Sequence, residues 1–119
     1  MAQSFAAGDD LIFQLESGYG LLRVLAVEGE GAARVWHLLA FEELFPDVES
    51  AELALTKPTS LTIRTPHMAL TERAFERTPA AKLGNRAISD TELAPYREWL
   101  RSEKRVVSDR SALLMLGIR

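Results

Sequence analysis

The fold is set by residues 9–41, which read DDLIFQLESGYGLLRVLAVEGEGAARVWHLLAF. Residues 11–16 alternate with the period of two that is expected for a strand with one better-buried face. Residues 21–27 are apolar on both faces apart from Arg23, which is typical of a central strand covered on both sides. Residues 33–41 alternate again. The stretch therefore predicts three consecutive strands.

Short glycine-containing turns are expected between these strands. Residues 18–20 (GYG) separate the first two runs, and residues 28–31 (EGEG) separate the second from the third. Turns of this length cannot carry the long crossover that parallel strands need. The three strands are therefore predicted to form an antiparallel meander.

The segment 47–56 fits a helix and a strand about equally well. Asp47 could cap a short helix through Leu55, but Ala51, Leu53 and Leu55 also alternate with their neighbours. Both interpretations stay open. The sequence KPTS that follows predicts a loop.

Another strand and a short helix are expected next. Residues 61–64 predict a strand with Leu61 and Ile63 facing inward. Pro66 is expected to end it, because proline has no backbone N–H to donate. Thr71 is then a plausible N-cap for a short helix that starts at the next residue.

A helix is also predicted in the C-terminal third, where Ser89 and Glu92 match a capping box. Pro95 is a difficulty, because proline is poorly tolerated beyond the first helical turn. Either a single turn precedes a helix that begins at Pro95, or one helix begins near Thr91 and holds Pro95 in its first turn. Both alternatives bury the same stripe, which consists of Leu93, Tyr96, Trp99 and Leu100.

The end of the chain predicts one more short helix. Ser108 or Asp109 could cap it, and Gly117 would end it. Its apolar residues would be Leu113, Leu114 and Leu116.

The elements together predict a single α+β domain over residues 1–119. We expect a curved antiparallel sheet of about four to six strands packed against C-terminal helices. The N-terminus has neither a basic start nor a long apolar stretch, so no secretory signal is expected. No run of about 18 to 20 apolar residues is present, so we expect a cytoplasmic protein that does not enter a membrane.

The charges are unevenly divided along the chain. Residues 1–56 carry two basic side chains against ten acidic ones, whereas residues 57–119 carry twelve against seven. The overall net charge of −3 conceals this division. It predicts either two surfaces that meet different partners or two halves that pack against each other.

Catalytic and metal-binding patterns are weak. The chain has no cysteine, and its two histidines lack the close spacing of a zinc site. His37 is expected in the core, because its same-face neighbours on the strand are apolar. His67 follows Pro66 in a predicted loop and is the better candidate. We assign no catalytic residue, metal or cofactor.

The acidic half predicts a binding surface. Its carboxylates lie mainly in predicted turns and loop ends, where we expect them to be exposed and to attract a basic protein. The candidate residues are Asp9, Asp10, Glu42 and Glu43. The leading hypothesis is therefore a small, non-catalytic protein-binding or inhibitor module.

Two other functions compete with this hypothesis. Four basic residues lie three or four apart along one predicted helical surface, which is typical of a helix that contacts phosphates. They are Arg97, Arg101, Lys104 and Arg105. A nucleic-acid-associated protein is therefore the second hypothesis, although an ordinary solvated helix face also fits. A hydrolase that uses His67 with a carboxylate is the third.

The N-terminal quarter resembles a known family. Residues 8–13 (GDDLIF), the 18–20 turn and the strand LLRVL that follows resemble the opening of the immunity 26 family of bacterial toxin-immunity systems. Residues 82–85 (KLGN), followed by 90–93, add a looser similarity. The resemblance implies a non-catalytic protein that binds a toxin, and it carries over no functional residue. A Gly-Asp entry to a two-stranded meander is also common in small SH3-like barrels, so such a barrel is expected as one form of the N-terminal strands.

Overall fold

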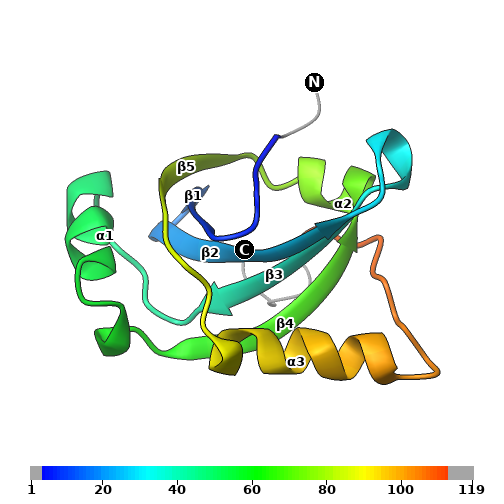
Figure 1. The fold of residues 1–119 in the computed structure, drawn as a ribbon. Helices are drawn as coiled ribbons and strands as arrows, with labels where there is room; N and C mark the ends of the chain where they lie inside the picture. Colours follow the sequence, from blue (N-terminus) through cyan, green and yellow to red (C-terminus); the bar gives the residue numbers. More distant parts are fainter. Residues whose placement is uncertain (1–3, 113–119) are drawn as a thin grey trace.

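The computed structural model describes residues 4–112, which form an α+β fold with one open antiparallel sheet (Figure 1). The strand order is β4-β3-β2-β1-β5. The strands are β1 (Asp9–Leu15), β2 (Gly18–Glu28), β3 (Val35–Phe41), β4 (Ile63–Thr71) and β5 (Ala80–Asn85). The helices are α1 (Val48–Leu55), α2 (Glu72–Glu76) and α3 (Asp90–Arg101), with 3-10 turns η1 (Gly31–Ala33) and η2 (Pro58–Ser60). The sheet is not closed, so the SH3-like barrel is not formed.

The meander of β1, β2 and β3 confirms the predicted start of the fold, and β2 lies at the centre of the sheet. The predicted turn at residues 18–20 is wrong by two residues, because Glu16 and Ser17 make the turn and β2 begins at Gly18. Gly18 and Gly20 are instead required because other atoms lie too close to leave room for a Cβ. A Cβ on Gly18 would lie 2.6 Å from the backbone oxygen of Phe45, to which the start of β2 is hydrogen-bonded.

The two faces of the sheet bury separate hydrophobic cores. The core under α2 contains Trp36 and Phe75, whose ring centroids lie 4.7 Å apart, and Phe5 packs edge-on against both rings. The core on the other face includes Leu21 and Leu39 and is covered by α1 and α3. Figure 1 shows α1 and α2 at opposite ends of the sheet, with α3 alongside β4. A sheet covered on both faces explains why residues 21–27 of β2 are apolar apart from Arg23.

The ambiguous segment 47–56 contains the helix α1. The Asp47 carboxylate accepts a 2.7 Å hydrogen bond from the backbone N–H of Ser50, so it is the N-cap that the sequence offered. Ala51 is buried against the sheet. The apolar residues of this segment fit both a helix and a strand, and the N-cap at Asp47 selects the helix.

The predicted end of a strand at Pro66 is wrong. β4 continues through Pro66 to Thr71 because it is an edge strand, where a missing N–H breaks no hydrogen-bond ladder. Its register against β3 also shifts at this point: Leu38 pairs with Met68, but Ala40 pairs with Thr65. The extra residue of this bulge accommodates the proline. His67 consequently lies in a strand and not in the predicted loop.

Two details at the margins of the sheet also differ from expectation. Ile63 was expected to face inward, but its side chain is 48% exposed. The edge strand β5, which pairs with β1, was not predicted. It has no clear alternation of apolar residues, so no sequence pattern indicates it.

The caps of α2 and α3 were predicted correctly. Thr71 caps α2, and Ser89 with Glu92 forms the capping box of α3. α3 is one continuous helix from Asp90, and it holds Pro95 in its second turn. Of the two alternatives, the single helix is therefore the closer one, but Pro95 lies deeper than expected.

The apolar residues of the predicted last helix, 113–116, lie outside the described residues. Its two proposed caps are described but cap no helix there: Ser108 forms a β-bridge with Leu70, and Asp109 pairs with Arg73.

The packing of Gly20 gives a direct test of the sheet. A Cβ at this position would lie 2.6 Å from the Phe13 ring, and Phe13 is buried in the core. We expect Gly20→Ala to lower the free energy of unfolding by about 1–3 kcal/mol, because the Phe13 ring would have to leave its packed position. The measurement is the urea midpoint at an unchanged m-value.

Gly84 in β5 is the matched control for this variant. It has no positive φ, and a Cβ there would meet nothing within 4 Å. Gly84→Ala should change stability by no more than about 0.5 kcal/mol. Equal urea midpoints for the two variants would contradict the packing described for Gly20.

Candidate functional site

Asp9 and Asp10, two of the four residues of the predicted acidic surface, are buried, each with only 2% of its surface exposed. Asp10 accepts two hydrogen bonds from Arg86, at 2.6 and 2.9 Å, and lies 3.2 Å from Arg23. Asp9 accepts from Asn85 at 2.8 Å. The expectation that both carboxylates are exposed is therefore wrong. The pairing of β1 with β5 brings their partners to them from more than 70 residues away.

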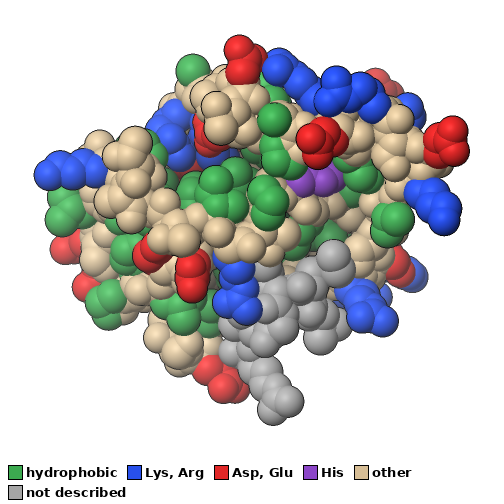
Figure 2. Space-filling view, turned by 90° about the horizontal axis from the view of Figure 1, so that it is seen from below, with side chains coloured by type: hydrophobic (Ala, Val, Ile, Leu, Met, Phe, Trp, Pro, Cys, Tyr) green, Lys and Arg blue, Asp and Glu red, His purple; other side chains and the backbone are tan. Residues whose placement is uncertain are grey.

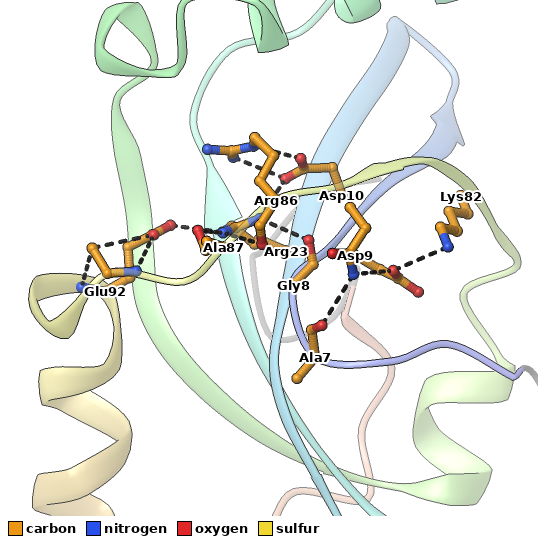
Figure 3. Close-up of polar contacts among 11 residues, drawn as sticks. Ala7, Gly8, Asp9, Asp10, Arg23, Lys82, Arg86, Ala87 and Glu92 are labelled. Carbon is orange, nitrogen blue, oxygen red and sulfur yellow. Dashed lines mark hydrogen bonds and ion pairs between the residues drawn. The ribbon is translucent and has the colours of Figure 1, made fainter.

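Arg23 is the centre of this buried network (Figure 3). Its side chain is fully buried and donates to the Glu92 carboxylate at 2.7 Å. It also donates to Asp10 and to the backbone oxygens of Gly8, Arg86 and Ala87. The five acceptors belong to the start of β1, the segment after β5 and the first turn of α3. The guanidinium therefore joins these three parts of the chain to β2.

The charges of the network balance. Asp10 and Glu92 face the guanidinium groups of Arg23 and Arg86. Burial would raise the pKa of Glu92, but the Ser89 backbone N–H and Arg23 outweigh it and hold this pKa below its usual value. The hydrogen bonds that Arg86 donates to Asp10 raise the pKa of Arg86. Each carboxylate of the network is paired with a guanidinium, so we assign the network a structural role.

The two histidines form a second cluster, between the sheet and α3. His37 Nε2 lies 2.5 Å from Glu28 Oε1, and His37 Nδ1 lies 2.9 Å from His67 Nε2. Tyr96 and Trp99 of α3 pack over the pair, with ring centroids 4.5 and 4.7 Å from His37. Figure 2, which shows the side of the molecule that carries α3, has histidine at the surface among hydrophobic side chains.

Hydrogen bonding fixes the protons of the histidine pair, His37 and His67. An ionised Glu28 can only accept, so His37 Nε2 carries a proton and donates it. His37 Nδ1 then accepts from His67 Nε2–H. Burial lowers the pKa of His37, and Glu28 offsets this only in part. Burial, with a smaller effect of His37, lowers the pKa of His67 to about 4.

The sequence did not reveal the histidine pair. His37 was expected in the core, which is confirmed, since it has no exposed surface. Its contact with Glu28 could have been found from the β2–β3 hairpin, in which Glu28 pairs with Val35, two residues before His37. Its contact with His67 could not, because β4 was expected to end at Pro66.

The basic residues do not form the expected helical surface. α3 ends at Arg101, so Lys104 and Arg105 lie beyond it. Arg97 pairs with Asp90 at 3.2 Å. The Arg105 guanidinium lies over the Trp99 ring, 5.9 Å from the centroid, and donates to the Leu100 oxygen. The prediction of one continuous basic helix face is therefore wrong.

The other two residues of the predicted acidic surface, Glu42 and Glu43, lie between β3 and α1, and Glu42 is exposed. The Thr62 backbone N–H donates to Glu43 and holds its pKa below the usual value against the opposing effect of burial. Further exposed acidic and apolar side chains follow in the chain. We define the α1 surface as Glu42, Leu44, Asp47, Val48, Glu49, Glu52 and Leu53.

The comparisons give no relative for this chain: no family model, no curated protein and no solved structure matches it. Within residues 4–112, no group of three or more His, Cys, Asp or Glu side chains could hold a metal ion. No helix in this part of the chain is long and apolar enough to cross a membrane. The function of the candidate site is therefore inferred from its geometry alone.

Loss of the Arg23 side chain tests whether the buried network is structural. Arg23→Met should lower the free energy of unfolding by about 3–5 kcal/mol, because it leaves Asp10 and Glu92 without their buried partner. The measurement is chemical denaturation followed by circular dichroism.

The exposed ion pair of α3 provides the control. Arg97→Met removes an arginine whose partner Asp90 is 90% exposed, so stability should change by less than about 0.5 kcal/mol. If Arg23→Met were as mild as Arg97→Met, the network would not hold the fold together.

Proposed function

We propose that this protein binds a basic protein partner through the α1 surface. One observation carries the proposal: three of the five large hydrophobic side chains exposed within residues 4–112 lie in this short segment. They are Leu44, Val48 and Leu53, with exposed fractions of 44%, 36% and 71%. Exposed large apolar side chains are a common feature of protein-binding surfaces, and these three belong to one segment of the chain.

The charge of the α1 surface indicates the kind of partner. Within the part of the chain that the structure describes, its carboxylates at Glu42, Glu49 and Glu52 form no ion pair. In Figure 2, acidic and hydrophobic side chains are interspersed at the end of the molecule that carries α1. Apolar contacts supply affinity, and the acidic rim would attract and orient a positively charged partner.

The role of an immunity-like inhibitor fits this surface. Members of the family that the N-terminal quarter resembles bind toxins and do not catalyse reactions. A cationic toxin would be attracted by the carboxylates that remain after Asp9 and Asp10 are assigned to the buried network. The residues from Glu42 to Leu53, outside that resemblance, would make the contact.

The two competing functions have less support. A nucleic-acid contact would need the basic residues in and after α3, but Arg97 and Arg105 are engaged within the protein. A hydrolase would use His67 as a general base, and a pKa of about 4 makes it a weak base at neutral pH. Binding at the α1 surface is therefore the function that we propose.

Site-specific photo-crosslinking tests the binding surface. A benzophenone side chain at position 53 should crosslink a basic protein in an extract of the source cells. The control is the same group at Val106, which is 73% exposed but lies outside the α1 surface. Mass spectrometry identifies the partner. Equal crosslinking from both positions would contradict the proposal.

Charge reversal with the purified partner then tests the electrostatics. Changing Glu42, Glu49 and Glu52 to lysine should weaken binding by about tenfold or more at low salt, with a smaller effect at high salt. The control changes the exposed Glu76, Glu98 and Glu103 to lysine, which alters the net charge equally. Calorimetry measures both affinities. If both triple variants weaken binding equally, only the net charge matters and the surface is wrongly assigned.

A further inference from the structure

The two halves of α3 are attached to the sheet by different chemistry. The N-terminal half is held by the capping box and by the buried Glu92–Arg23 ion pair. The C-terminal half is held by Tyr96 and Trp99, which pack on the histidine pair. Both aromatic rings also lie about 6 Å from His67, at 6.0 and 5.9 Å.

The histidine pair has room for one proton between its rings. His37 Nδ1 and His67 Nε2 lie 2.9 Å apart, and one of the two nitrogens must accept. If both rings become imidazolium, two N–H groups point at each other and two positive charges lie in contact. The stacked arrangement of the rings, 12° from parallel, is then lost. Double protonation therefore removes the surface on which α3 rests.

Few groups around the pair can compensate for positive charge. From β2, Glu28 faces His37, but its side chain is 41% exposed and it contacts only one of the two rings. From α3, Tyr96 contributes a neutral phenol, whose pKa is raised by burial and by Glu28. From the segment after α3, Arg105 adds a further positive charge over Trp99. The surroundings therefore favour neutral rings.

The pH range of this effect follows from linkage. The pKa of both histidines is lower in the folded protein than the ordinary value of 6.5. Their contribution to stability is therefore complete above about pH 6.5 and is lost as the pH falls toward about 4. The pKa of Glu92 is held below its usual 4.5, so the ion pair of the N-terminal half persists down to about pH 4.5.

We propose that the C-terminal half of α3 is an acid-released element: protonation of the His37–His67 pair detaches it from the sheet while the N-terminal half stays bound through Glu92 and Arg23. The released half carries Tyr96, Trp99 and the basic residue Arg101. Release also exposes the rings of His37 and His67 on the face of the sheet. The fold therefore has a local transition in mild acid that precedes its global unfolding.

Amide hydrogen exchange on the unmodified protein tests this between pH 7 and pH 4.5. After correction for the intrinsic pH dependence of exchange, protection of residues 96–101 should fall at least tenfold, while that of β2 stays unchanged. Trp36→Phe leaves Trp99 as the single tryptophan of the chain, and its emission should shift to the red over the same range. Loss of α3 and β2 protection together, or no loss at all, would overturn the proposal.

Two variants with opposite expected effects test whether protonation of the His37–His67 pair causes the release of α3. His67→Gln keeps a donor for His37 Nδ1 but cannot be protonated, so release should need a pH lower by about one unit or more. Glu28→Gln removes the carboxylate that stabilises a charged His37, so release should occur at higher pH. If either variant leaves the midpoint of release unchanged, protonation of the pair is not its cause.

Discussion

The buried guanidinium of Arg23 is the constraint on which the rest of the structure depends. A charged group without contact to water must be surrounded by hydrogen-bond acceptors, and a single strand cannot provide them. Five oxygens from the start of β1, the segment after β5 and the first turn of α3 meet around it. This requirement places β5 at the edge beside β1, and it brings α3 to the same face of the sheet.

The structure divides the asymmetric charge of the chain into an internal and an external part. Arg23 and Arg34, the two basic residues of the first half, pair with Glu92 and Glu72 of the second half. In the other direction, Lys82 and Arg86 pair with Asp9 and Asp10. The acidic residues from 42 to 52 have no such partner in the described chain and remain at the surface. Part of the charge asymmetry is thus internal complementarity, and the rest forms the surface that we propose for binding.

The two ends of the molecule differ in what they can do. At the end that carries α1, the exposed side chains include acidic and apolar residues as well as Lys57, and this is where we propose a contact with another protein. Along α3, the decisive groups are two neutral imidazoles in contact, whose state changes in mild acid. Arg23 is fully buried and holds the first turn of α3 through Glu92. This separate attachment is what allows the proposed local change along α3 without loss of the fold.

The sequence by itself determined the features that depend on neighbours along the chain. These are the meander of β1, β2 and β3, the central position of β2, and the caps of α2 and α3 at Thr71 and Ser89, whereas the helix capped by Asp47 was one of two open alternatives. Periodicity and capping act over a few residues, so they can be inferred without knowledge of the fold. Even there, the turn predicted at residues 18–20 is wrong, because Gly18 and Gly20 are required by their close contacts with Phe45 and Phe13 and not by a turn.

Only the tertiary structure decided the environment of the functional side chains. Asp10 meets Arg86 across 76 positions, Arg23 meets Glu92 across 69, and His37 meets His67 across 30. A carboxylate in a short loop looks exposed until a distant arginine covers it, and a proline looks like the end of a strand until an edge position and a bulge accommodate it. Local patterns carry no information on these partners, because strand pairing brings them together only after the chain has folded.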